Sequence, residues 1–329
     1  MKRSLVIQTA FLGDAVLVTS ILEKLHTFYP DATIDLVVRH GNQGLFDGHP
    51  FLNKVYVWDK RSGKTKALFD LIRELRGTHY DHIINAQRFF STGLMTVLAR
   101  GNEKIGYDKN PLSFLFTRKV KHVIGDGRHE VDRLNALIAH LTDNERPLPR
   151  LYPNDAHRAE AATLRNTYVA PGKQYVCLAP ASVWYTKQWP EAKWVELIQQ
   201  LPPAIEVLLI GGPGDTQHCE RIASTAGRGH VLTRKLSLMS SAALMAGAAM
   251  NYVNDSAPLH IASAMDAPVT AIFCSTVPAF GFGPLRANGR VVETSEKLDC
   301  RPCGLHGYKA CPKGHFKCAL GIDVGTAIT

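Results

Sequence analysis

Short runs of consecutive apolar residues alternate along the chain with longer segments in which apolar residues recur at every third or fourth position. The runs are typical of buried strands, and the spaced segments are typical of helices with one buried face. We expect strands at 5–7, 34–38, 55–58, 82–85, 175–178, 207–210, 252–254 and 269–273. Helices are expected at 17–28, 68–75, 194–201 and 261–265. This alternation predicts an α/β fold whose parallel sheets carry helices on both faces.

The strand–helix alternation is interrupted once, by a polar, proline-containing stretch at 142–153. A chain of 329 residues is long for a single core and suits two domains. We expect an N-terminal domain over 1–160 and a C-terminal domain over 170–329, with the boundary within 155–172. Two doubly wound domains predict a ligand cleft at the carboxyl ends of their strands.

Composition narrows the class of protein. Hydrophobic residues make up 45% and charged residues 20%, which is typical of a soluble globular protein. No apolar stretch approaches the roughly 18 residues of a membrane span. The chain begins like a signal peptide, but Gln8, Thr9 and Asp14 interrupt the apolar run and no cleavage pattern follows. We therefore expect a cytoplasmic location.

The charge of the chain indicates an acidic partner. The formal net charge is +9, and most of the excess lies in the first 150 residues, with basic clusters at 60–66 and 118–121. Such a surface favours nucleic acid, anionic lipid or a phosphorylated glycan, and the alternative is a solvated surface that only keeps the protein soluble. The chain has no RNA-binding signature, so nucleic acid is not an expected partner.

The segment Asn-Asp-Ser-Ala-Pro-Leu-His at 254–260 lies where an expected strand leads into an expected helix. Free backbone N–H groups and the positive end of the helix dipole converge at such a point and favour an anionic ligand. A more ordinary interpretation is that Asp255 or Ser256 caps the helix. The sequence leaves both interpretations open.

A second junction of this kind contains Gly13 and Asp14, directly after the first strand. The glycine permits a tight turn or a close approach of the backbone to a ligand. The Asp14 carboxylate can accept a proton from a bound hydroxyl, or it can simply cap the helix.

Two loops of the C-terminal half also carry candidate chemistry. Lys187 lies among aromatic residues at 184–189 and can supply positive charge to a phosphate or leaving group, unless it is a solvated surface lysine. Gly211 and Gly212 begin a glycine-rich turn, but Gln217 stands at the third glycine position of the dinucleotide pattern. We therefore predict a strand–helix turn there and not an NAD site.

The seven cysteines fall into two groups. Three are scattered and are expected to be buried, reduced thiols: Cys177, Cys219 and Cys274. The others form a C-x2-C-x7-C-x6-C pattern in the tail: Cys300, Cys303, Cys311 and Cys318. This pattern suits a structural zinc site, and a disulfide clip or four free thiols are the alternatives.

Taken in order, these pieces resemble glycosyltransferase family 9, the ADP-heptose–lipopolysaccharide heptosyltransferases. The resemblance spans about residues 4–285. The matching positions are Gly13, Asp14, Thr19, His129, Arg133, 186–190, 208–212, 254–256, His260 and 273–284. The resemblance implies the GT-B architecture: two Rossmann-like domains facing a central cleft, with the acceptor on the N-terminal domain and the nucleotide sugar on the C-terminal one.

The resemblance also implies roles for individual residues. Asp14 matches the proposed general base, and Lys187 matches the lysine that contacts the donor diphosphate. The implied donor-binding residues are Ser182, Thr186, Lys187, Gly211, Gly212, Asp255, Ser256, Ala257 and His260, with Ala257 standing where the family usually has glycine. The implied acceptor-binding residues are Gly13, Thr19, His129 and Arg133.

The resemblance predicts an inverting transferase that moves heptose from ADP-heptose to a lipopolysaccharide-type inner-core acceptor. That acceptor is an anionic, lipid-linked glycan, so peripheral contact with the inner membrane surface is expected. No cofactor is expected in catalysis, and a zinc ion in the tail would be structural. A GT-B-shaped sugar-nucleotide epimerase and a non-catalytic nucleotide-sugar-binding protein are the alternatives.

Overall fold

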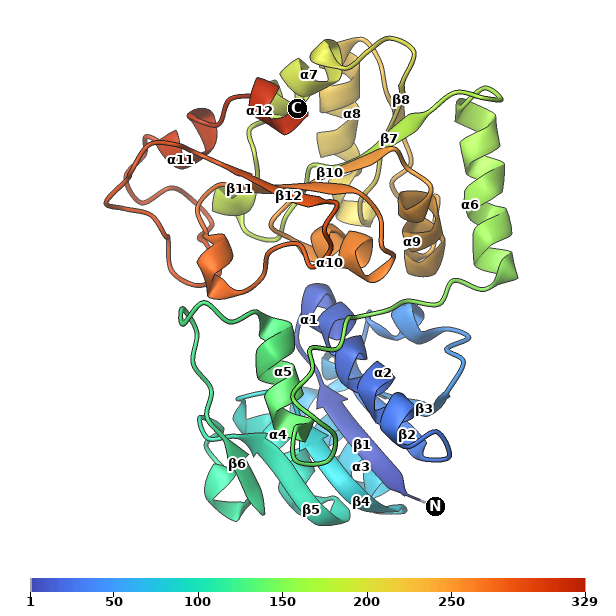
Figure 1. Ribbon diagram of the computed structural model, residues 1–329, viewed down its shortest axis with the longest axis vertical. Helices are drawn as coiled ribbons and strands as arrows, with labels where there is room; N and C mark the ends of the chain where they lie inside the picture. Colours follow the sequence, from blue (N-terminus) through green and yellow to red (C-terminus); the bar gives the residue numbers. More distant parts are fainter. Residues whose placement is uncertain (1, 329) are drawn as a thin grey trace. The chain divides into compact units, whose positions relative to one another are not determined.

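The computed structural model describes residues 2–328, and the chain divides into two compact units. Unit 1 is Met1–Tyr152 and unit 2 is Pro153–Thr329. Each unit contains a six-stranded sheet with parallel pairing throughout and helices on both faces (Figure 1). The expected fold class, α/β with two doubly wound Rossmann-like domains, is confirmed.

The sheet of unit 1 has the strand order β3-β2-β1-β4-β5-β6. Its strands are β1 (Arg3–Gln8), β2 (Thr33–Arg39), β3 (Leu52–Trp58), β4 (His79–Asn85), β5 (Arg100–Tyr107) and β6 (Arg118–Val120). Its α-helices are α1 (Leu12–Leu17), α2 (Thr19–Phe28), α3 (Lys64–Leu75), α4 (Phe90–Leu98) and α5 (Glu130–Ile138). The chain continues from β1 to one side of the sheet and later returns to the other side at β4. The topological switch point, where open α/β sheets bind ligands, therefore lies between β1 and β4.

The sheet of unit 2 has the order β12-β11-β10-β7-β8-β9. Its strands are β7 (Tyr175–Ala179), β8 (Glu206–Leu209), β9 (His230–Val231), β10 (Met250–Asn254), β11 (Val269–Phe273) and β12 (Gly289–Glu293). Its α-helices are α6 (Asp155–Tyr168), α7 (Glu191–Gln200), α8 (Thr216–Ala226), α9 (Leu238–Ala246), α10 (Ala257–Ala264), α11 (Lys317–Leu320) and α12 (Gly325–Ile328). By the same argument, the switch point of unit 2 lies between β7 and β10.

One expected helix is broken. The segment 17–28 is not continuous but divides at Val18 into α1 and α2. There the Thr19 hydroxyl donates to the carbonyl of Val16 at 2.7 Å, and the Ser20 hydroxyl donates to that of Leu17 at 2.7 Å. Hydroxyl groups that bond nearby carbonyls bend or interrupt helices, which explains the break.

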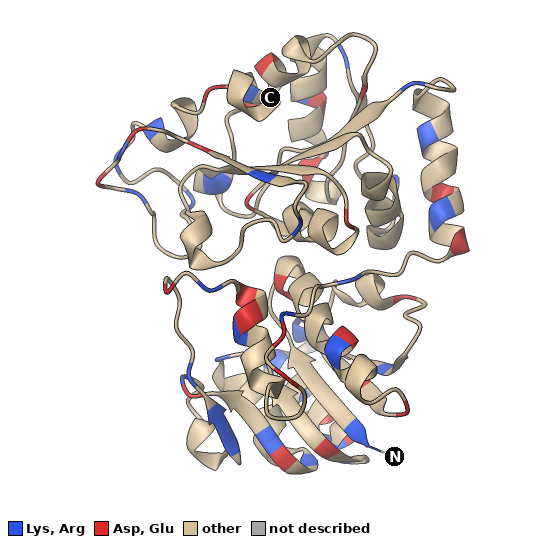
Figure 2. Cartoon of the chain, viewed as in Figure 1, with Lys and Arg blue, Asp and Glu red and all other residues tan. Residues whose placement is uncertain are grey.

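The division between the units falls before the expected boundary region of 155–172. Helix α6 occupies most of that region and belongs to unit 2, where Glu160 accepts a hydrogen bond from Ser240 of α9 and Tyr168 accepts one from Lys235. Charges of both signs occur along α6 (Figure 2). The helix therefore lacks the apolar stripe from which the sequence would have predicted that it packs on the core of unit 2.

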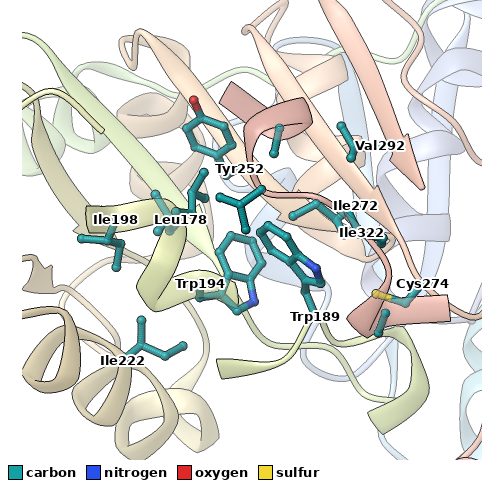
Figure 3. Packing of buried hydrophobic residues seen from close by; sticks show 14 of the residues in the cluster. Leu178, Trp189, Trp194, Ile198, Ile222, Tyr252, Ile272, Cys274, Val292 and Ile322 are labelled. Atoms are coloured by element: carbon teal, nitrogen blue, oxygen red, sulfur yellow. The ribbon is translucent and has the colours of Figure 1, made fainter. Parts of the chain in front are cut away.

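Two tryptophans lie at the centre of the unit 2 core (Figure 3). Trp189 and Trp194 are fully buried, and their rings meet edge to face with centroids 5.3 Å apart. Cys318 and Ile322 from the C-terminal tail belong to the same apolar cluster. Because Trp189 follows Lys187 by two residues, the Lys187 loop and the cysteine-rich tail are anchored in one core.

Candidate active site

An ion pair between Lys187 and Asp255 occupies the switch point of unit 2. Lys187 ends a short 3-10 turn in the loop after β7, and Asp255 directly follows β10. Lys187 Nζ lies 2.7 Å from Asp255 Oδ2, and the two side chains are only 15% and 6% exposed. The same Asp255 oxygen accepts a hydrogen bond from the Thr276 hydroxyl at 2.5 Å. Lys187 is therefore a buried, paired lysine and not a solvated surface lysine.

The buried amide of Asn254 fixes the two strand ends that carry this pair. Its Oδ1 accepts a hydrogen bond from the Trp189 backbone N–H at 3.0 Å, and its Nδ2 donates to the Pro180 carbonyl at 2.7 Å. One side chain thus ties the end of β10 to both ends of the loop that contains Lys187. The sequence motif at 254–260 included Asn254 but did not reveal this role.

Helix α10 begins at the switch point without a side-chain cap. Ser256 occupies the N-cap position, but its side chain makes no capping hydrogen bond. Its hydroxyl lies 3.4 Å from the Asn254 carbonyl instead, and the Asp255 carboxylate is taken by Lys187 and Thr276. An uncapped helix N-terminus beside a lysine is suited to an anionic group. The structure thus shows no side-chain cap by Ser256, and the anion site stays a prediction.

The cysteine-rich tail contacts the Lys187 loop directly, which no sequence pattern predicted. The Thr186 N–H donates to the Tyr308 carbonyl at 3.1 Å, and the Tyr308 N–H donates to Thr186 Oγ1 at 2.7 Å. The Ser275 hydroxyl donates to the same Thr186 oxygen at 3.0 Å. Gly307 has a φ of +77°, and a Cβ there would lie 2.9 Å from Thr186 Oγ1. Only glycine permits this close approach of the tail to the loop.

The cysteines are all free thiols, so the disulfide alternative is wrong. The three expected core thiols are buried: Cys177, Cys219 and Cys274. Burial, followed by the nearby thiols of Cys303, Cys311 and Cys300, raises the pKa of Cys318 to about 11. The four tail cysteines are therefore neighbours, although within residues 2–328 no group of three or more His, Cys, Asp or Glu side chains is arranged to hold a metal ion.

The switch point of unit 1 contains Asp14. It is the third residue of α1 and partly exposed, while Phe11 occupies the N-cap position without a side-chain cap. Asp14 is therefore not the cap itself, and its charge is stabilised by the positive end of the helix dipole. Gly13 lies inside the same helical turn and not in a tight turn before it.

The other three predicted acceptor residues are buried in unit 1. The Thr19 hydroxyl accepts a hydrogen bond from the Arg150 N–H at 2.9 Å. His129 caps α5 through its Nδ1. Arg133 Nε lies 2.7 Å from a carboxylate oxygen of Glu130, a group whose pKa is raised by burial. Their role in acceptor binding stays a prediction, and each has a structural role as well.

The remaining predicted donor residues lie on elements next to the ion pair. Gly211 and Gly212 are exposed and follow β8, the neighbour of β7. The Ser182 carbonyl accepts a hydrogen bond from Gln188 Nε2 at 2.7 Å within the Lys187 loop. His260 is buried, 5% exposed, one turn into α10. All of these elements converge on the carboxyl edge of the unit 2 sheet.

Comparison with known proteins gives a consistent family. The profile of glycosyltransferase family 9 (heptosyltransferase) matches residues 68–307. Lipopolysaccharide heptosyltransferase 1 of Pseudomonas aeruginosa is 27% identical over 322 residues, which covers 92% of this chain and 86% of that protein.

Solved structures share the fold. A family 9 glycosyl transferase from Veillonella parvula has a TM-score of 0.81 at 22% identity, covering 89% of this chain and 86% of that one. Escherichia coli heptosyltransferase WaaC with ADP-2-deoxy-2-fluoro heptose has a TM-score of 0.70 at 24% identity, covering 89% and 93%. The architecture is that of GT-B glycosyltransferases. With a family match over well more than half of its length, the chain belongs to glycosyltransferase family 9, the heptosyltransferases.

Proposed function

We propose that this chain is an inverting glycosyltransferase that moves heptose from ADP-heptose to an inner-core acceptor of the lipopolysaccharide type. The observation that carries the proposal is the Lys187–Asp255 pair beside the uncapped start of α10. Membership of the heptosyltransferase family and the names of the relatives support the sugar, the nucleotide and the acceptor.

The donor diphosphate would bind at the switch point of unit 2. Negative charge gathers on the leaving ADP as the bond to the anomeric carbon breaks. The Lys187 ammonium and the first N–H groups of α10 are positioned donors that stabilise this charge without reorganising. Pro258, the second residue of α10, has no N–H and cannot donate to the phosphates. The donor N–H groups closest to the phosphates would therefore be those of Ala257 and the residues before it.

The acceptor hydroxyl would be activated in unit 1. A sugar hydroxyl is far too weak an acid to attack unaided at neutral pH, so a carboxylate must take its proton as the new bond forms. Asp14 is partly exposed at the carboxyl edge of β1 and is suited to this role. Attack on the anomeric carbon from the side opposite the leaving ADP inverts its configuration.

A reconstituted transfer assay tests the proposal. The purified protein is incubated with ADP-heptose and with lipopolysaccharide from a strain whose core lacks heptose. We expect ADP release and a heptosylated product only when both substrates are present, with inverted anomeric configuration by NMR. Turnover of the donor without acceptor would indicate an epimerase, and binding without turnover would indicate a non-catalytic protein. Either result would overturn the proposal.

We further propose that the enzyme works in the cytoplasm at the inner surface of the membrane, where a lipid-linked acceptor is found. None of the described helices is both long enough and apolar enough to cross a membrane. The exposed basic side chains of Lys60, Arg61, Lys64 and Lys66 suit an anionic surface. Co-sedimentation with vesicles containing anionic lipid tests this, and equal binding to neutral vesicles would contradict it.

We also propose that the four tail thiols hold a structural zinc ion. The proposal is supported by the proximity of the four thiols, which contributes to the raised pKa of Cys318. Thiolates are also preferred zinc ligands. In this proposal zinc would hold the tail together and take no part in transfer. Elemental analysis of the purified protein should find about one zinc per chain. If the purified protein contains no metal and is still folded and fully active, the tail does not need zinc and the proposal is contradicted.

A further inference from the structure

An arginine at the switch point of unit 1 has no role in the proposed mechanism. β1 and β4 lie side by side in parallel (Figure 1), so the segments that follow them share one edge of the sheet. Asp14 follows β1, and Arg88 follows β4 by three residues. A hydrogen bond from Gln87 Nε2 to Gln8 Oε1 joins the two segments. Arg88 therefore lies on the same edge of the sheet as the proposed base.

The backbone around Arg88 is held rigidly by Asn110, which is 2% exposed. The Asn110 Nδ2 group donates to the Gln87 carbonyl at 3.3 Å and to the Phe89 carbonyl at 3.0 Å, on either side of Arg88. Gly93 makes this possible, because a Cβ there would lie 2.3 Å from Asn110 Oδ1. The structure thus fixes the position from which the Arg88 side chain projects.

The Arg88 guanidinium has donors to spare, unlike its arginine neighbours. Arg128 donates to Asp126 at 2.8 Å and Arg133 donates to Glu130 at 2.7 Å. Arg88 is half-buried, and its side chain makes no hydrogen bond within the described residues. Its charge acts on the buried Glu130 carboxylate, but the hydrogen bond to that carboxylate comes from Arg133. A guanidinium carries five N–H donors, and burying part of them without a hydrogen-bond acceptor is unfavourable. Such a group is expected to gain its partner from a ligand.

Two exposed aromatic rings accompany Arg88 at this edge. Phe89 is 60% exposed and Phe11 is 53% exposed, although both follow buried strands. The guanidinium of Arg39 lies 5.2 Å from the centre of the Phe11 ring. Aromatic walls with a few placed polar groups are typical of sites for small organic ligands, including sugars.

We infer that Arg88 binds an anionic group on the acceptor, a carboxylate or phosphate carried by the sugar that presents the attacking hydroxyl or by its neighbour. Phe11 and Phe89 contact the apolar faces of the same sugars. Arg88 is then a specificity-determining residue: it selects an acidic glycan and sets its register relative to Asp14. This inference rests on the proposed function, since it assumes that unit 1 receives the acceptor.

The test compares Arg88→Gln with Arg100→Gln, which removes the same charge from an exposed arginine at the opposite end of the unit 1 sheet. A deacylated, water-soluble acceptor is used so that membrane binding plays no part. It is supplied intact, dephosphorylated, or with its carboxylates reduced to alcohols. For Arg88→Gln we expect kcat/KM toward the intact acceptor to fall about 10- to 100-fold, with an unchanged KM for ADP-heptose. Arg100→Gln should match the wild type.

The modified acceptors identify the anion. Wild-type activity should fall with the acceptor that lacks the group bound by Arg88, and Arg88→Gln should be insensitive to that same change. Sensitivity to dephosphorylation assigns a phosphate, and sensitivity to reduction assigns a carboxylate. If Arg88→Gln behaves like Arg100→Gln, the inference is overturned while the proposed function stands. The same holds if the activity of Arg88→Gln, relative to the wild type, falls by the same factor on all three acceptors. If the wild type transfers to none of them, both fall together.

Discussion

Both units place charged side chains at their topological switch points, and in unit 2 an ion pair joins Lys187 to Asp255 there. Lys187 is held by Asp255, whose carboxylate Thr276 also contacts, before any ligand is present. In unit 1, the Arg88 side chain makes no hydrogen bond within the described residues, although its charge acts on the buried Glu130 carboxylate. A pre-formed pair suits a site that receives the same diphosphate in every reaction cycle. A guanidinium whose N–H donors have no hydrogen-bond acceptor in the protein suits a site that discriminates among acceptor substrates.

The two switch points also differ in what supports them. Arg88 is held by Asn110, only 22 positions along the chain. The Lys187 loop is held partly by Tyr308, more than a hundred residues away in the cysteine-rich tail. The proposed donor site therefore depends on contacts with the end of the chain, whereas Arg88 is positioned by contacts within the first 110 residues. The predictions below test that difference.

The largest effect is expected from Asp14→Asn, which removes the proposed base but keeps the shape of the side chain. Because proton transfer by a positioned carboxylate contributes about 10²- to 10⁴-fold, kcat should fall by that factor. ADP affinity, measured by calorimetry, should not change, since the proposed donor site lies in unit 2. Asp31→Asn, at an exposed turn of unit 1, is the control. A kcat for Asp14→Asn equal to that of the control would remove Asp14 from the mechanism.

Lys187→Met should affect both binding and stability. Loss of the ammonium should weaken ADP binding by about 10- to 100-fold, as charge-assisted hydrogen bonds to the diphosphate are lost. It also leaves Asp255 buried without its counter-charge, at a cost of about 3–5 kcal/mol in the free energy of unfolding.

The double variant Lys187→Met/Asp255→Asn separates these two effects. Removing both charges should restore most of the stability, measured by urea unfolding, while ADP binding stays weak. If ADP binding recovers together with stability, Lys187 is a structural residue and the donor site has to be placed elsewhere.

Thr186→Val tests the contact between the tail and the donor loop. It leaves the Tyr308 N–H and the Ser275 hydroxyl without their acceptor, which should cost about 1–3 kcal/mol in the free energy of unfolding. The KM for ADP-heptose should rise more than kcat falls, because Lys187 is next in the chain. Thr186→Ser keeps the hydroxyl and should restore the donor KM. A donor KM that is normal in Thr186→Val would show that the tail stabilises unit 2 without positioning its site.

The sequence predicted most of the fold because most strands are buried on both faces. The eight expected strands are all present, with ends displaced by three residues or fewer. Three of the elements that were missed have a weak apolar pattern. β5 and β12 contain exposed or half-buried residues, and α6 buries only His157 and Ala161. Their positions are set by tertiary packing, which a local pattern does not contain.

The candidate site was predictable only where its residues fall in a local motif. Asp14, Lys187 and Asp255 each stand at a strand–helix junction, so the sequence identified them one by one. The pairing of Lys187 with Asp255, and the contact of Thr186 with Tyr308, join positions 68 or more residues apart, and no local pattern contains them. Arg88 had no local signal except its place after a strand, and only the structure shows that its N–H donors have no hydrogen-bond acceptor within the described residues.

The smallest effect concerns pH, and it is expected in unit 1. Burial, followed by the charges of Arg88 and Arg133, lowers the pKa of His122 to about 4. An unfolded chain would protonate this histidine below about pH 6.5, so between pH 6.5 and 4 the unfolded state binds the extra proton. The contribution of neutral His122 to stability is therefore complete above pH 6.5 and declines as the pH falls toward 4.

His122→Phe, which keeps a ring against Tyr107, tests this assignment. Between pH 7 and 5 the wild type should lose about 1–2 kcal/mol through this group, and the variant should lose correspondingly less. Hydrogen exchange should locate the difference in β5 and the segment after β6. His79→Gln, at an exposed site of the same unit, should follow the wild type. A His122→Phe variant as acid-sensitive as the wild type would mean that other groups control the acid response of unit 1.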